Sequence, residues 1–168
     1  MKRFAVLLLS MFIAHFCVAQ TYIALVPALV NTAGTFGEKT NVSFEVGRQL
    51  GVFSIGADVG KTNMGKVKGR DTTVYLEVRP NLNIFEHGKF TNTLTIGIGG
   101  VFNARENFMT ELTTGMEYAF NDHYHFNANF GQYYYSGLTT SKTVTFFGLS
   151  FMHYFGGAKN TALVELPK

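Results

Sequence analysis

Ionisable side chains recur at alternate positions of this sequence, among residues that are otherwise small or hydroxylated. Glu77 and Arg79 stand two positions apart, and Glu111 and Glu117 stand six apart. Because a strand directs alternate side chains to opposite faces of its sheet, such residues would share one face with Thr, Ser, Asn and Gly. Carboxylates around a guanidinium can relay protons, hold an ion, or pair with the cation to fix a polar core.

Six residues of this face form the candidate site: Glu45, Asp58, Glu77, Arg79, Glu111 and Glu117. Arg79 is the one cation among them and is placed to bridge two or more carboxylates. The remaining acids would have to carry a proton, contact trapped water, or pair with Arg48 or Arg105. These residue types fit two alternatives. One is a path for ions or protons, and the other is a packed polar core.

The histidines are the other residues with chemical potential. His123 and His125 would lie on one face of a strand, where a metal ion could use both, but the sequence identifies no further ligand. His153 falls on the apolar positions of its segment and Ser150 on the opposite ones, so no nucleophile–base pair emerges. We therefore expect no catalytic residues, no metal site and no cofactor.

The elements that position these residues show most clearly in Phe90–Phe102. Its apolar set is Phe90, Leu94, Ile96, Ile98 and Phe102, and its other set is Thr91, Thr93, Thr95, Gly97 and Gly99. Similar alternation occurs in Asn41–Arg48, Gly51–Gly60, Thr72–Phe85, Phe108–Phe120, His123–Tyr135 and Thr143–Phe155, whereas Thr21–Val30 is apolar at both sets of positions. The pattern predicts an all-β chain of about eight strands.

The connections between these segments alternate in length. Long connections rich in Gly, Asn, Thr and Lys are expected at Asn31–Thr40, Lys61–Arg70 and Ser136–Lys142, with a shorter one at Asn103–Asn107. Tight turns are expected at Arg48–Gly51, Glu86–Lys89 and Asn121–Asp122. Transmembrane barrels show the same asymmetry, with short periplasmic turns and longer outer loops. The order predicts an antiparallel up-and-down barrel with both ends of the chain in the periplasm.

The N-terminal segment has the features of an export signal. Lys2 and Arg3 precede the apolar run Phe4–Phe16, and a small-residue cleavage site ends at Ala19. A transmembrane helix and a lipoprotein anchored at Cys17 are the alternatives. We expect residues 1–19 to be a signal peptide, residues 20–156 a barrel, and residues 157–168 a short periplasmic tail.

The charge of the chain argues against a nucleic-acid partner. The sequence has 14 Lys and Arg against 11 Asp and Glu, and removal of Lys2 and Arg3 with the signal leaves 12 against 11. A net charge of +1 means that the overall charge of the mature chain does not support a nucleic-acid partner. Cys17, the single cysteine, would leave with the signal, so no disulfide is expected.

Two barrels of opposite sidedness fit the alternation. A soluble carrier barrel would place Phe and Leu inside, and a transmembrane barrel would place them outside. Bulky side chains occupy the apolar positions and Gly, Thr, Ser and Asn the others, which suits the narrow interior of an eight-stranded barrel. Aromatic residues near strand ends, with Tyr133–Tyr135 among them, would form interfacial girdles. We therefore expect the polar face inside, packed rather than conducting.

At this point the sequence resembles the OmpX/OmpA-type eight-stranded outer-membrane β-barrels. The likeness covers about Gln20–Phe155 and includes Glu45–Gly51, similar to a first inner turn of such barrels, and Gly148–Phe155, similar to a terminal strand. The resemblance implies a monomer in the outer membrane of a Gram-negative cell, inserted by the outer-membrane assembly machinery. It also implies a structural or surface-interaction role, although the family includes adhesins, membrane stabilisers and lipid-modifying enzymes.

One expected outer loop carries a cluster of cations: Lys61, Lys66, Lys68 and Arg70. Their charges could bind the phosphates of lipopolysaccharide or an acidic partner, and the alternative is an ordinary solvated loop. The function predicted from the sequence is thus membrane stabilisation or adhesion. A lipid-modifying enzyme and a soluble ligand carrier stay as the alternatives.

Overall fold

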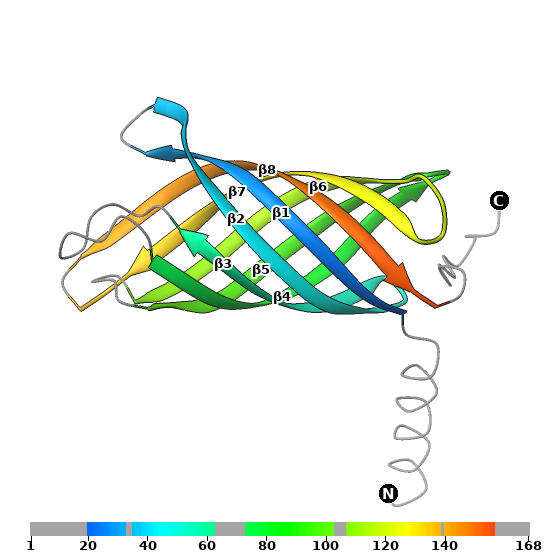
Figure 1. Ribbon diagram of the computed structural model, residues 1–168, viewed down its shortest axis with the longest axis horizontal. Coiled ribbons are helices and arrows are strands. Elements are labelled where there is room, and N and C mark those ends of the chain that lie inside the picture. The colour runs from blue at the N-terminus through cyan, green and yellow to red at the C-terminus, as the bar shows by residue number, and fades with distance from the viewer. Residues whose placement is uncertain (1–19, 33–34, 63–72, 103–106, 139, 157–168) are drawn as a thin grey trace, which may run out of the picture.

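The computed structural model describes residues 20–32, 35–62, 73–102, 107–138 and 140–156. Eight strands form one closed antiparallel barrel: β1 (Gln20–Thr32), β2 (Thr35–Leu50), β3 (Phe53–Thr62), β4 (Thr73–His87), β5 (Phe90–Phe102), β6 (Phe108–Ala119), β7 (Tyr124–Ser136) and β8 (Ser141–Phe155). Each strand pairs with the next along the chain, and β1 closes the barrel against β8, with Tyr22 opposite Tyr154 (Figure 1). The predicted fold class is confirmed.

The turns at the end where the chain enters and leaves the barrel are tight. β2 and β3 are joined by residues 51–52, and β4 and β5 by residues 88–89. Gly51 and Gly88 have φ angles of 67° and 60°, a backbone conformation that glycine adopts without steric cost. Gln49 also donates a side-chain hydrogen bond to the Gly51 carbonyl. The tight turns that the sequence predicted at this end are therefore observed.

The first connection at the opposite end differs from its prediction as a long loop over Asn31–Thr40. β1 continues to Thr32 and β2 begins at Thr35, with Asn31 opposite Phe36 after a register shift at Val30/Asn31. Two antiparallel strands satisfy each other's backbone groups, so they can extend beyond the apolar belt. The polar composition of Asn31–Thr40 was therefore no sign of irregular backbone, because strand residues beyond the apolar belt can also be polar.

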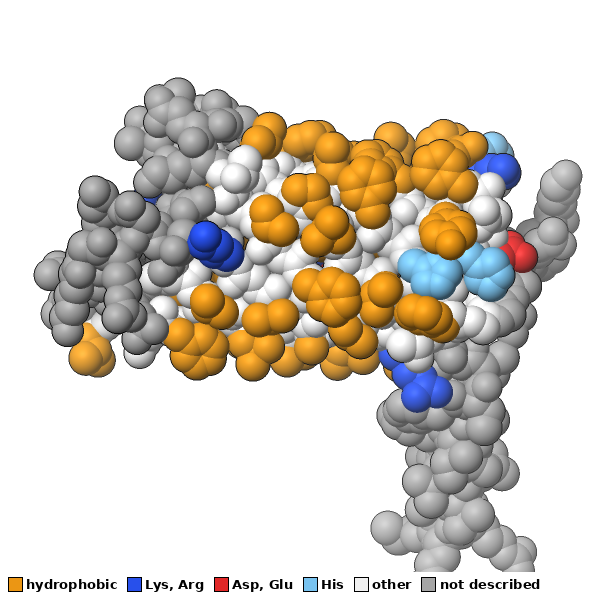
Figure 2. Space-filling view, viewed as in Figure 1, with side chains coloured by type: hydrophobic (Ala, Val, Ile, Leu, Met, Phe, Trp, Pro, Cys, Tyr) orange, Lys and Arg blue, Asp and Glu red, His pale blue; other side chains and the backbone are white. Residues whose placement is uncertain are grey.

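The barrel wall has two chemically distinct surfaces. Leu76, Ile98 and Phe130 point outward with 49%, 55% and 53% of their surface exposed, whereas Asp58 and Thr93 point inward with 1% exposed. Figure 2 shows apolar side chains along the visible wall, with the visible charged and imidazole groups toward its ends. Among the described residues, no helix is long and apolar enough to cross a membrane. The polar-inside arrangement predicted from the sequence is the one observed.

The interior is polar in its middle and apolar toward the outer loops. Its apolar cluster consists of Ala28, Val30, Tyr75, Val101, Met109, Tyr133, Tyr135, Val144 and Phe146. Tyr133 stacks on Phe146 with ring centroids 4.3 Å apart, and Tyr133 and Tyr135 are both buried. The expectation that all of Tyr133–Tyr135 belong to an interfacial girdle is wrong for these two residues, because only Tyr134 faces outward. Because all three residues are aromatic, their types do not show which side chains face inward and which face outward.

β1 also takes definite faces, which its apolar composition did not reveal. Tyr22, Ala24 and Val26 point inward, where they form a second apolar cluster with Tyr154. Leu25 and Leu29 point outward with 50% and 41% of their surface exposed. Small and aromatic side chains of β1 thus fill the interior near the closing seam with β8.

Candidate functional site: the polar barrel interior

Arg79 of β4 bridges two other strands through the interior. Its Nη1 donates to Oε2 of Glu45 on β2 at 2.6 Å. Its Nε and Nη2 donate to the two carboxylate oxygens of Glu111 on β6, at 2.9 and 2.8 Å. The guanidinium side chain is 7% exposed. Because β3 and β5 lie between the strands it joins, this cation connects alternate strands of the wall across the lumen.

Hydroxyl groups complete the surroundings of both carboxylates. The Tyr22 hydroxyl donates to Glu45 Oε1 at 2.5 Å, and the Thr113 hydroxyl donates to Glu111 Oε1 at 2.6 Å. Every carboxylate oxygen of these two acids therefore accepts at least one hydrogen bond. A buried ion pair is well tolerated only when its remaining lone pairs are satisfied in this way.

Asp58 and Glu77 face the same interior without contacting Arg79 directly. They lie opposite each other on β3 and β4, and each is 1% exposed. Tyr75 donates to Asp58 Oδ2 at 2.8 Å, while neither oxygen of Glu77 accepts a hydrogen bond from a described donor. The sequence placed both acids in the interior, but it did not separate them from the acids that pair with Arg79.

Glu117 belongs to a second polar pair nearer the end with the tight turns. Its Oε1 lies 2.5 Å from Nδ1 of His125, and the two side chains are 4% and 1% exposed. The His125 ring packs against Tyr154 with centroids 4.5 Å apart, and Tyr154 packs against Tyr22. An aromatic layer thus links this pair to the Arg79 cluster, since the Tyr22 hydroxyl also donates to Glu45. The contact of Glu117 with a histidine was not predicted from the sequence.

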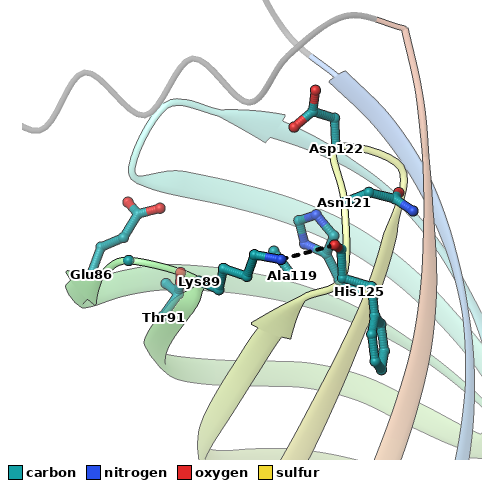
Figure 3. A pocket seen from close by; sticks show the side chains of 9 residues that line it. Glu86, Lys89, Thr91, Ala119, Asn121, Asp122 and His125 are labelled. Carbon is teal, nitrogen blue, oxygen red and sulfur yellow. Dashed lines mark hydrogen bonds between the residues drawn. The ribbon is translucent and has the colours of Figure 1, made fainter.

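A pocket of about 330 Å³ opens beneath the second pair, at the barrel mouth with the tight turns. Figure 3 shows Lys89 reaching across the opening, with Glu86 and Asp122 on separate sides of it. Lys89 Nζ lies 3.4 Å from the Phe120 carbonyl, and His125 lines the wall with an Nε2 atom that has no described partner. The pocket is a mixed-charge vestibule below a filled lumen.

The histidines do not gather at one point. His125 lies inside the barrel, whereas His123 is exposed in the turn before β7, where its Nδ1 lies 3.1 Å from the Tyr154 carbonyl. The prediction that these two residues share a face is therefore wrong, since His123 precedes the regular part of the strand. His153 packs beside His123 on the outer surface, with ring centroids 6.1 Å apart. Within the described ranges, no group of three His, Cys, Asp or Glu residues could hold a metal ion.

The cationic cluster expected in one outer loop is only partly described. Lys61 lies exposed at the end of β3, on the outward side of the wall. Lys66, Lys68 and Arg70 lie outside the described residues.

A closed eight-stranded barrel with an apolar exterior and a lumen filled by polar side chains is the architecture of small outer-membrane-type β-barrels. No family model and no curated protein matches the chain. Among solved structures, Neisserial surface protein A (NspA) is 12% identical, with 84% of this chain and 96% of that chain covered and a TM-score of 0.54. The de novo designed protein TMB2.3 is 10% identical over 82% of this chain and 97% of that chain, also with a TM-score of 0.54.

The attachment invasion locus protein Ail of Yersinia pestis is 15% identical, with 82% of this chain and 97% of that chain covered and a TM-score of 0.42. These likenesses are of fold. The likenesses to NspA and TMB2.3 agree with the closed barrel, so the eight-stranded, outer-membrane type of barrel predicted from the sequence is confirmed.

Proposed function

We propose that this chain is a non-enzymatic, sealed barrel that stabilises the outer membrane and holds outer loops for contact with lipopolysaccharide or an acidic partner. The observation that carries the proposal is the bridge from Arg79 to Glu45 and Glu111 across the lumen. This bridge blocks the space that a transported solute would need. It also ties β2, β4 and β6 together, which suits a rigid support.

A structural role accounts for the close fit of the interior. Side chains at Gly56 and Gly97 would collide with the carboxyl groups of Glu45 and Glu77. These glycines make room for the polar network, and the interior of an eight-stranded barrel is just wide enough to be filled by such side chains.

The loop role rests on charge at the outer rim. Lys61 is the next-to-last residue of β3 and is exposed on the outward side, and Lys66, Lys68 and Arg70 follow it in the sequence. Ammonium and guanidinium groups at this position suit phosphate groups of the outer leaflet. We propose that the barrel works as a monomer and that its terminal strand, ending at Phe155, is read by the assembly machinery.

The non-enzymatic part of the proposal is supported by the arrangement of the candidate nucleophile and base. Ser150 points inward and accepts a hydrogen bond from Asn129 at 2.8 Å. His153 lies on the outer surface against Phe155 and Tyr124. The wall of the barrel separates the two residues, so they do not form a catalytic pair.

Conductance and acyl-transfer measurements test this proposal. Purified mature protein in planar bilayers should show no conductance steps, and incubation with labelled lipid A should give no acyl product. Steps with the wild-type barrel would contradict the sealed lumen. A labelled product would contradict the non-enzymatic role.

A further inference from the structure

Uncharged polar side chains interrupt the apolar wall on the outward surface of β6, β7 and β8. The polar wall patch consists of Thr110, Gln132, Tyr134, Thr143 and Thr145. The outward positions of β2 to β4 are different, with Val42, Phe44, Val46, Ile55, Val59, Val74, Leu76, Val78 and Leu82 exposed. The wall is therefore asymmetric around its circumference, and the polar groups are concentrated on one side.

The strand register makes the patch continuous. Gln132 lies between Leu112 of β6 and Thr145 of β8. Tyr134 lies between Thr110 and Thr143 in the next row toward the loops. A hollow of about 320 Å³ opens here, lined by Thr110, Leu112, Gln132, Tyr134 and Thr143, by Ile96 of β5, and by Glu111.

The polar groups of this hollow are unsatisfied within the described barrel. Thr114, one row below, donates to the Thr93 carbonyl at 3.2 Å. By contrast, the side chains of Gln132, Tyr134 and Thr143 make no hydrogen bond to another described residue. An amide or hydroxyl without a partner costs about 2–7 kcal/mol in a hydrocarbon environment. An external group that supplies hydrogen bonds at this depth would remove that cost.

The depth of the patch matches the region where acyl chains join a lipid headgroup. Tyr134 and Thr143 lie two residues from the loop ends of β7 and β8, and Gln132 lies four residues from the end of β7. With a rise of ~3.4 Å per residue and a tilt of ~40°, these positions lie about 5 and 10 Å below the strand ends. At this depth the carbonyl, amide and hydroxyl groups of a lipid lie between its headgroup and its hydrocarbon chains.

We propose that this hollow binds the acyl-linkage region of one lipopolysaccharide-type lipid of the outer leaflet. The amide and hydroxyl groups of Gln132, Tyr134 and Thr143 would exchange hydrogen bonds with amide-linked, hydroxylated acyl groups. One acyl chain would lie on Leu112 and Ile96. This inference rests on the outer-membrane barrel proposed above and adds a defined lipid site to it.

The hydrogen-bonding groups of the hollow support this ligand over others. Gln132 and Tyr134 are exposed on the outward face, and Thr143 lies beside Tyr134, so amide and hydroxyl groups face the linkage region of a lipid. Lys142 falls on the inward-facing positions of β8, opposite the buried Tyr135, and is not part of this patch. Glycerophospholipids carry ester linkages without N–H donors, so they match the amide oxygen of Gln132 less well. A second barrel would present a convex wall and leave the hollow unfilled.

Retention of lipid A after detergent exchange tests the site. The full mature chain is incubated with lipid A, moved into fresh detergent, and analysed for bound lipid by native mass spectrometry. We expect wild-type protein to retain lipid A, and Gln132→Leu combined with Thr143→Val to retain it at least ~10-fold less, since ~1.4 kcal/mol of lost hydrogen bonding corresponds to tenfold. Asn92→Leu is the matched control, because it removes an outward amide from the periplasmic half of β5.

The outcomes separate this inference from its alternatives. Equal retention of lipid A by the double variant and by the wild type would overturn the site. Retention of phosphatidylglycerol by the wild type at the same level as lipid A would also overturn it. A wild-type dimer that the double variant loses would also overturn it, in favour of a second copy. Both substitutions place apolar groups on a lipid-facing wall, so the variant should keep the heat-modifiable gel migration of a folded barrel. Conductance by the wild type would contradict the sealed barrel and leave the lipid measurement valid.

Discussion

Arg79 and Glu111 are joined by two parallel hydrogen bonds across the interior, from Nε to Oε2 at 2.9 Å and from Nη2 to Oε1 at 2.8 Å. The planar guanidinium matches the planar carboxylate, so this contact fixes orientation as well as distance. The third contact, from Nη1 to Glu45, uses the remaining side of the same group. One cation therefore sets the relative positions of three strands.

Loss of this cation should strongly destabilise the barrel. Arg79→Ala leaves Glu45 and Glu111 buried without their cation, and removing one member of a buried pair costs about 3–5 kcal/mol. The free energy of unfolding, measured by urea titration in lipid vesicles with circular dichroism, should fall by that amount. Lys61→Ala, which removes an exposed cation from the end of β3, should change it little. An unchanged midpoint for Arg79→Ala would remove the proposed bridging role.

Two neighbouring glycines of β5 should respond differently to a methyl group. A Cβ at Gly99 would lie 2.8 Å from the Glu77 Cα and closer still to the Leu76 carbonyl oxygen, both backbone atoms of β4. A Cβ at Gly100 would meet only the Asn107 carbonyl at 3.5 Å, an ordinary contact. We expect Gly99→Ala to lower the free energy of unfolding by about 1–3 kcal/mol.

Gly100→Ala is the matched control for this substitution. It should be neutral or stabilise by about 0.4–1 kcal/mol, because alanine restricts the unfolded chain. Equal effects of the two substitutions would mean that β4 and β5 are not as closely apposed at Gly99 as the structure has them.

The sequence predicted much of this arrangement, and the reasons for its failures are physical. Alternation in Phe90–Phe102 fixed both faces of β5 because its two residue sets differ in size and polarity. The pairing of Glu111 with Arg79 could not be predicted, since it depends on closure of the barrel, which brings β4 and β6 together across the lumen. Glu117 was assigned to the same interior, but its histidine partner depends on the register between β6 and β7.

The faces of some strands could not be assigned from residue types alone. Tyr133–Tyr135 are aromatic at both sets of positions, so nothing in their composition separates the inward from the outward side chains. β1 is apolar at both sets of positions over Thr21–Val30 for a different reason: its inward side chains pack in the two apolar clusters, and Tyr22 meets the charged network through its hydroxyl group, which donates to Glu45. The inward side chains of a transmembrane barrel strand need not be polar where they pack against other side chains.

The sidedness of the wall can be measured with arginine substitutions on β5. Ile96 lies at the middle of the strand with 50% of its surface exposed, and Phe102 lies at its outer end with 54% exposed. Arginine on the lipid face costs about 2–4 kcal/mol at the bilayer midplane and about 0–1 kcal/mol near the interface. Ile96→Arg should therefore destabilise the barrel in vesicles far more than Phe102→Arg. Small, equal effects would show that this surface faces water.

The contact between His125 and Glu117 should show energetic coupling in a double-mutant cycle. The two side chains are buried with Nδ1 and Oε1 2.5 Å apart, so the loss on removing both should be smaller than the sum of the two single losses. Residues in direct contact couple by about 0.5–3 kcal/mol. We expect a coupling energy in the upper half of that range for His125→Ala and Glu117→Ala, from urea unfolding in vesicles.

The same cycle with His153→Ala in place of His125→Ala is the control, because His153 lies on the outer surface beside Phe155. A coupling for His125 no larger than that for His153 would mean that the buried pair contributes no specific stability to this end of the barrel.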